Sequence, residues 1–86
     1  MVTAYFELFL LFLLSMEKTT FTKKLGKQIA RLREENELTQ VQLAKQCKKP
    51  KQNINRLEAG AINPSGYFLY ELSKALNVPI AKLFEF

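Results

Sequence analysis

Apolar residues spaced three or four positions apart constrain this chain more than any other feature. The first such series is Phe21, Leu25, Ile29 and Leu32, which share one face of a helix. The same spacing predicts helices over residues 22–36, 40–47, 51–59, 66–76 and 79–84. No segment alternates apolar and polar residues as a half-buried strand does, and no repeat is present. The sequence therefore predicts the all-α fold class.

Residues that begin or end helices separate these segments. Thr39 is a candidate N-cap, and Gln42 three residues later completes a capping box. Pro50 lies at the start of the third helix, where proline is tolerated. Gly60 follows that helix as a C′ residue, and Ser65 is a candidate cap for the fourth. Short helices joined by tight turns are the expected result.

The first 16 residues differ from the rest of the chain. All but three of them are hydrophobic, the exceptions being Thr3, Glu7 and Ser15. A membrane-spanning helix needs about 20 apolar residues, and a secretory signal needs a positive charge ahead of its apolar part. The first basic residue is Lys18, so neither interpretation is well supported. We treat residues 1–17 as an apolar N-terminal extension that could form a helix, and residues 18–86 as the domain.

Three interpretations of the extension remain open. The reading frame could begin upstream of a natural start at Met16, which would leave the extension without a role. The segment could instead be a packing or dimerisation helix, because a helix that is apolar on all sides must be buried by something. A membrane or export role is the third interpretation.

The composition excludes most catalytic chemistry. The chain has 86 residues, no histidine and one cysteine. A zinc cluster, an internal disulfide and the usual nucleophile–base pairs therefore cannot form, and we expect no catalytic residue, no metal and no cofactor. Cys47 is expected in the core, and a lone thiol suits a reducing cytoplasm. The chain is predicted not to be an enzyme.

The charge indicates the kind of partner. Lysine and arginine number 13 against 8 acidic residues, giving a net charge of +5. A small basic domain favours a polyanion, and nucleic acid is the first candidate.

Residues 40–59 have the spacing of a helix-turn-helix, which is two short helices joined by a turn of three or four residues. The helices cross closely, so a small residue is needed in the first and a branched aliphatic residue in the second. Ala44 and Ile54 meet these two requirements.

From Leu25 to Leu83 the chain resembles the Cro/phage-repressor (Xre-type) helix-turn-helix family. The residues that carry this resemblance are Ile29-Ala30-Arg31-Leu32-Arg33, Leu38-Thr39-Gln40, Leu43-Ala44, Ile54, Leu57-Glu58, Gly60, Asn63-Pro64-Ser65, Leu69, Leu72, Ala75-Leu76 and Leu83. The resemblance implies a compact five-helix domain, similar to that of lambda repressor, which binds operator DNA as a two-fold dimer.

The resemblance also implies which residues meet DNA. The exposed front of the third helix would enter the major groove, and its candidate base contacts are Lys51, Gln52, Asn55 and Arg56. Their chemistry agrees, because Gln and Asn pair with adenine while Lys and Arg reach guanine. Candidate phosphate contacts are Gln40, Lys45, Lys48, Lys49 and Asn63. In similar proteins an arginine late in the first helix pairs with a glutamate late in the third, and Arg33 and Glu58 hold these places.

The turn departs from the family pattern. Lys48 stands where glycine is usual, so a left-handed backbone there would cost about 1–2 kcal/mol. Lys49 replaces an apolar residue, and Pro50 replaces the usual Ser or Thr cap. Ala61-Ile62 replaces basic residues often found before the Asn-Pro pair. These differences concern the geometry of the turn and the contacts of one loop.

The leading interpretation is a sequence-specific regulator of transcription that binds double-stranded DNA, most simply a repressor acting as a homodimer on a palindromic operator. The main alternative is an antitoxin-like or other interaction module whose principal partner is a protein. A membrane-associated factor that uses residues 2–16 is the third and least favoured.

Overall fold

The computed structural model describes the backbone of residues 2–86 and the side chains of residues 5–11 and 17–86. Its elements in chain order are α1 (Val2–Glu35), α2 (Gln40–Gln46), α3 (Lys51–Glu58), α4 (Gly66–Ala75) and the 3-10 helix η1 (Ile80–Phe84). Residues 2–86 contain no strand. The all-α prediction is confirmed, and α2, α3, α4 and η1 lie within one residue of their predicted bounds.

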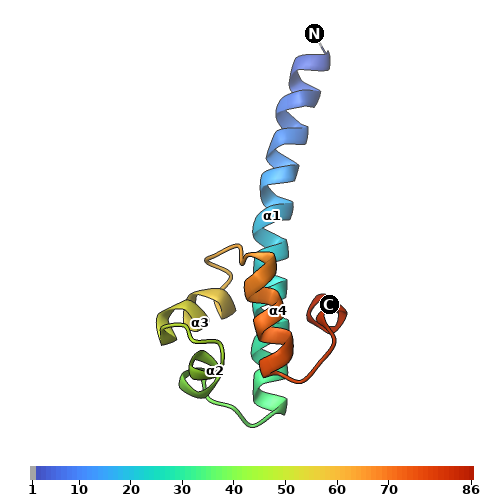
Figure 1. Cartoon of the computed structure of the whole chain (residues 1–86). Helices are drawn as coiled ribbons and strands as arrows, with labels where there is room; N and C mark the ends of the chain where they lie inside the picture. Colours follow the sequence, from blue (N-terminus) through green and yellow to red (C-terminus); the bar gives the residue numbers. More distant parts are fainter. Residues whose placement is uncertain (1) are drawn as a thin grey trace.

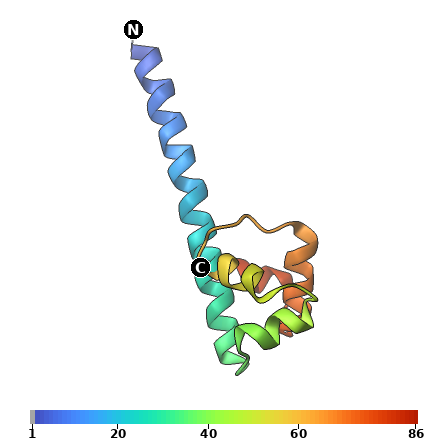
Figure 2. The same cartoon turned by 90° about the vertical axis from the view of Figure 1, so that its left-hand side faces the viewer.

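Helix α1 is far longer than predicted. The expected start was residue 22, whereas the helix begins at Val2 and runs without a break to Glu35. No glycine or proline occurs before Gly26, so nothing in the sequence interrupts the helix. The extension is therefore helical, and Figures 1 and 2 show it projecting from the other elements. Met1, the side chains of residues 2–4, and the side chains of residues 12–16 with the suggested start at Met16 lie outside the described residues.

The core lies between the second half of α1 and the other helices. Its members are buried and almost all aliphatic: Leu25, Ile29, Leu32, Leu43, Ala44, Cys47, Ile54, Leu57, Phe68, Leu72, Leu76 and Leu83. Helix α3 packs on both α1 and α2, and η1 packs on α1 and α4. We call this packed part, from Thr22 to the C-terminus, the body, since Thr22 is the first buried residue among those described.

The predicted caps are present. The Thr39 hydroxyl accepts a hydrogen bond from the Gln42 amide, and the Gln42 side chain accepts one from the Thr39 amide. The Ser65 hydroxyl accepts from the Phe68 amide at 3.1 Å. Pro50 is the N-cap of α3 and supplies no side-chain hydrogen bond. The two short helices of the motif therefore begin differently, α2 with a reciprocal cap and α3 without one.

Two residues beside these helices have a left-handed backbone. Gly60, which follows α3, has φ of 76°, and Lys48, in the turn between α2 and α3, has φ of 54°. Glycine adopts this conformation freely, whereas lysine does so at a cost. The turn therefore keeps the conformation expected of a glycine despite the lysine.

Candidate functional site

One face of α3 is held in the core, and the opposite face is open. Ile54 and Leu57 are buried and anchor the helix. The four predicted base-contacting residues Lys51, Gln52, Asn55 and Arg56 are all exposed. Positions i, i+1, i+4 and i+5 share one side of a helix, so these four side chains form one polar surface. We call this surface the α3 polar face.

The crossing of α2 and α3 follows from residue size. Ala44 and Ile54 are both buried, as Leu43 also is. The small Ala44 side chain permits close approach of the helices, and the branched Ile54 fills the space between them. This arrangement is the helix-turn-helix geometry expected for residues 40–59.

Arg33 and Glu58 are in contact across α1 and α3. The Arg33 Nε lies 2.7 Å from one oxygen of the Glu58 carboxylate, and an arginine terminal nitrogen lies 3.0 Å from the other. The remaining terminal nitrogen donates to the carbonyl of Leu38 at 2.8 Å. The hydrogen bond to Glu58 raises the pKa of the Arg33 guanidinium above its ordinary value, so the group stays charged. A two-point contact of this kind holds both distance and orientation between the helices.

A hydrogen-bonded chain links this ion pair to the α3 polar face. The Gln40 amide nitrogen donates to Glu58 at 3.0 Å. The Asn55 amide nitrogen lies 3.5 Å from the Gln40 oxygen, which is a weak contact. Gln40 therefore lies between Glu58 and Asn55. The resemblance indicated a position for Gln40, but nothing in the spacing indicated that it would connect a buried ion pair to a candidate base-contacting residue.

The candidate phosphate contacts fall into two groups. Lys45, Lys48 and Asn63 are exposed and free to reach a ligand. Lys49 is half-buried, with its ammonium 3.8 Å from a Glu71 oxygen and 5.3 Å from the centre of the Phe68 ring. The Lys49 side chain therefore packs against α4, at a position where an apolar residue is usual.

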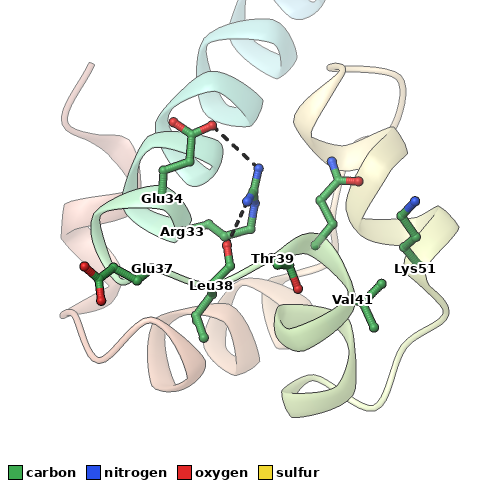
Figure 3. A pocket seen from close by; sticks show the side chains of 8 residues that line it. Arg33, Glu34, Glu37, Leu38, Thr39, Val41 and Lys51 are labelled. Carbon is green, nitrogen blue, oxygen red and sulfur yellow. Dashed lines mark hydrogen bonds and ion pairs between the residues drawn. The ribbon is translucent and has the colours of Figure 1, made fainter.

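A shallow hollow opens beside the start of α2. Figure 3 shows the side chains around it, with Arg33 joined to Glu34 and Leu38 on one side and Val41 and Lys51 on the other. The lining residues are Arg33, Glu34, Glu37, Leu38, Thr39, Gln40, Val41 and Lys51. Val41 is 45% exposed although it is apolar, which the sequence reasoning missed. Val41 and Lys51 line the same hollow, so an exposed apolar side chain lies near the α3 polar face.

Gly26 is a second residue that the sequence reasoning missed. A Cβ atom at this position would lie 2.4 Å from the Leu57 carbonyl oxygen and 2.6 Å from that of Glu58. The backbones of α1 and α3 approach each other here more closely than any other residue would allow. A glycine inside an otherwise regular helical pattern was the available signal.

Cys47 lies in the core, as expected. It is 1% exposed, and burial raises the pKa of its thiol. A neutral, enclosed thiol is a poor nucleophile.

The described residues offer neither a cluster of metal ligands nor a helix that could span a membrane. No group of three or more Cys, Asp or Glu side chains lies close enough together to hold a metal ion. Nor is any helix in the described part both long enough and apolar enough to cross a membrane.

Comparisons with known proteins agree with this geometry. The helix-turn-helix family HTH_3 matches residues 29–83. The restriction-modification controller protein C.AhdI from Aeromonas hydrophila superposes with a TM-score of 0.72 at 27% identity, covering 73% of this chain and 96% of that one. The clp gene regulator ClgR from C. glutamicum has a TM-score of 0.70 at 22% identity, covering 73% of this chain and 82% of that one.

A further solved structure shares the fold. It is an HTH_3 family transcriptional regulator from Vibrio cholerae, with a TM-score of 0.73 at 19% identity, covering 78% of this chain and 38% of that one. A search of curated protein sequences found no match.

Proposed function

This chain belongs to the HTH_3 helix-turn-helix family, and from that premise we propose that it is a DNA-binding regulator of transcription. In the finer form of the proposal it is a repressor that binds a palindromic operator as a two-fold dimer. The observation that carries the proposal is the α3 polar face, whose four side chains are exposed while the opposite side of the same helix is buried. No catalytic role is proposed. The single, buried cysteine suits a reducing compartment, so we place the protein in the cytoplasm.

The α3 polar face would read bases in the major groove. Gln52 and Asn55 can each pair with adenine through two hydrogen bonds, and Lys51 and Arg56 can each donate to guanine. Val41 adds an exposed methyl surface beside Lys51, which suits the methyl group of thymine. Together these residues offer contacts to more than one base type, as sequence-specific binding requires.

Residues flanking that face would contact phosphates. Gln40, Lys45, Lys48 and Asn63 are the proposed contacts, and Lys49 joins them only when its ammonium leaves Glu71. Phosphate contacts fix the register of the protein on DNA but carry no sequence information. They also release counterions, so affinity should fall steeply as salt increases.

The Arg33–Glu58 contact would support the α3 polar face from behind. Arg33 lies on α1 and Glu58 at the end of α3, and Gln40 extends the network to Asn55. We therefore propose that this ion pair sets the angle of α3 and makes no contact with bases itself.

Selection of bound sites from random duplex DNA, using the purified full chain, tests the proposal. A regulator should select a short palindromic sequence. Replacing Gln52 with alanine should weaken binding to that sequence about 10- to 100-fold and relax the preference at one position in each half-site. Replacing Lys45 with alanine should weaken binding to all sequences alike. Lys74→Ala, an exposed lysine on α4, is the matched control and should bind as the natural chain does.

One observation favours a second candidate function, an interaction module with a protein partner. Phe21 lies 6.2 Å from Phe84 and 5.7 Å from Phe86 between ring centres, and all three rings are exposed. Such an aromatic cluster is typical of protein contact surfaces. If no sequence is selected from the pool and the salt dependence of binding is flat, the DNA-binding proposal is wrong and this candidate takes its place.

A further inference from the structure

We propose that the N-terminal extension is a self-association helix, which pairs antiparallel with the same segment of a second copy of this chain. The contact lies outside the HTH_3 match, which covers residues 29–83. It supplies an interface for the dimer of the proposed function but uses none of the proposed DNA contacts, so its failure in a measurement without DNA leaves the DNA-binding proposal standing.

The first argument is the exposed apolar surface. Every described side chain of the extension is exposed, and six of them are large and apolar: Tyr5, Phe6, Leu8, Phe9, Leu10 and Leu11. Among the described residues, the first α1 side chain in ring contact with the body is Phe21, which meets Phe84 and Phe86, and the first buried one is Thr22. Helix α1 is continuous, so it holds this surface away from the body, where the chain itself cannot cover it (Figures 1 and 2). Exposed apolar area of this kind indicates a partner.

The second argument is that the apolar side chains differ between the two sides of the helix. At about 100° per residue, the leucines Leu8, Leu10 and Leu11 lie on the side that also carries Glu7. The aromatic residues Tyr5, Phe6 and Phe9 lie on the opposite side. The leucine side has the branched aliphatic side chains that interlock between two helices, and we call it the pairing face.

The third argument is charge complementarity, which identifies the occupant as a second copy. Glu7 and Lys18 are eleven residues apart, about three helical turns, so both lie on the pairing face. They are both exposed, and neither forms an ion pair within the described part of its own chain. In a parallel pair Glu7 would face Glu7 and Lys18 would face Lys18, which is repulsive. In an antiparallel pair centred between residues 12 and 13, each Glu7 faces the Lys18 of the other copy.

This arrangement has the symmetry of a closed dimer. A two-fold axis through the centre of the pair makes the two Glu7–Lys18 contacts identical. Burial of the leucines supplies the affinity, and the two charge contacts fix orientation and register. A lipid surface would leave Glu7 without a partner, which is why a second copy fits better.

Charge exchange in the full chain, read by sedimentation equilibrium over a concentration series, tests the pairing. The natural chain should dimerise. Glu7→Lys and Lys18→Glu should each weaken dimerisation at least about tenfold, because each places like charges opposite one another at both contacts. The double variant E7K/K18E should restore the natural dissociation constant to within about threefold, because it restores opposite charges. Lys27→Glu makes the same change of charge on α1 beyond the paired segment and should have no effect.

A second pair of variants tests which side of the helix is used. Leu11→Lys should abolish dimerisation, whereas Phe9→Lys on the aromatic side should preserve it. Circular dichroism of each variant shows whether the body remains folded. Both pairs of variants change exposed residues, so the fold should survive.

Three results would overturn the proposal. One is a natural chain that stays monomeric throughout the series. Another is a double variant that dimerises no better than either single variant. The last is dimerisation that Phe9→Lys abolishes and Leu11→Lys does not. If the natural chain is monomeric but floats with phosphatidylcholine–phosphatidylglycerol vesicles, the occupant is a lipid surface and the antiparallel pair is wrong.

Discussion

Helix α1 has two parts, the extension and the part that belongs to the body, and they differ in how much of their apolar surface is covered. In the body, Leu25, Ile29 and Leu32 are at most 2% exposed. In the extension, Leu8 and Leu11 are 65% and 63% exposed. Local helix propensity is good in both parts, so the difference lies in what packs against them. The comparison shows that forming a helix and stabilising it are separate problems.

The body part is stabilised by neighbours from distant parts of the chain. Helices α3 and η1 pack on it. The Arg33 side chain bonds to Glu58, 25 positions along the chain, and the Gln28 side chain bonds to the carbonyl of Lys82, 54 positions along it. The extension has no such neighbour among the described residues. Most helical stability in proteins comes from tertiary packing, so the body part should resist unfolding while the extension alone contributes little.

The largest expected effect separates the two parts directly. Ile29→Ala should lower the free energy of unfolding by about 4 kcal/mol, because it leaves a cavity at a fully buried position. Leu11→Ala should change it by less than about 0.5 kcal/mol when the chain is dilute enough to be monomeric. Urea denaturation followed by circular dichroism measures both. A similar loss for the two variants would mean that the extension packs on the body after all.

The next effect concerns charge. Arg33→Ala should cost about 3 kcal/mol, because it leaves the largely buried Glu58 carboxylate without its partner. Arg33→Lys should recover only part of this, since lysine cannot make the two-point contact. In the dilute monomer Glu7→Ala is the matched removal of a charge from the extension and should leave the urea midpoint unchanged. Unaltered stability and DNA affinity in Arg33→Ala would refute the supporting role.

A smaller effect tests where α1 touches α3. Gly26→Ala should cost about 2 kcal/mol, because the new methyl group would overlap the α3 backbone, even though alanine favours helices. Gly66→Ala is the control, since a Cβ there meets nothing within 4 Å, and it should gain about 0.5 kcal/mol. The thermal midpoints of the two variants should therefore move in opposite directions. A stabilised Gly26→Ala protein would show that α1 and α3 are further apart than the structure places them.

The smallest effect probes the body away from α1. Lys48 has φ of 54°, so Lys48→Gly should relieve strain and gain about 1 kcal/mol. The same gain should appear in a chain that carries Leu11→Lys, because the extension does not affect the turn. If Lys48→Gly raised the stability only in the chain with the natural extension, the extension and the body would not be independent. DNA affinity should still fall, because a proposed phosphate contact is lost.

Much of the body could be predicted from local signals. The caps at Thr39 and Ser65, the C′ glycine at Gly60 and the inward positions of Leu43 and Ile54 follow from rules that act within a few residues. The predicted start of α1 at residue 22 is wrong, because that prediction treated the change from an apolar to a mixed composition as a boundary. Composition does not end a helix, whereas glycine, proline or a cap does.

The candidate site was predicted in part. Its exposed face followed from helical spacing, because a residue opposite a buried one on the same helix faces solvent. Three features could not be found this way: the link from Glu58 through Gln40 to Asn55, the turn of Lys49 toward Glu71, and the exposure of Val41. Each depends on segments that meet in space, and the sequence spacing within one segment contains no information about the other.

The sequence by itself determined the four helices after α1, the caps at Thr39 and Ser65, the buried faces and the polar residues of the third helix, because these depend on interactions over three or four residues. Only the tertiary structure decided that the backbones of α1 and α3 meet at Gly26, that Gln40 links Glu58 to Asn55, and that the first part of α1 projects without cover. The physical reason is that local hydrogen bonding specifies each helix, whereas close packing selects which helices touch and which surface remains for a partner.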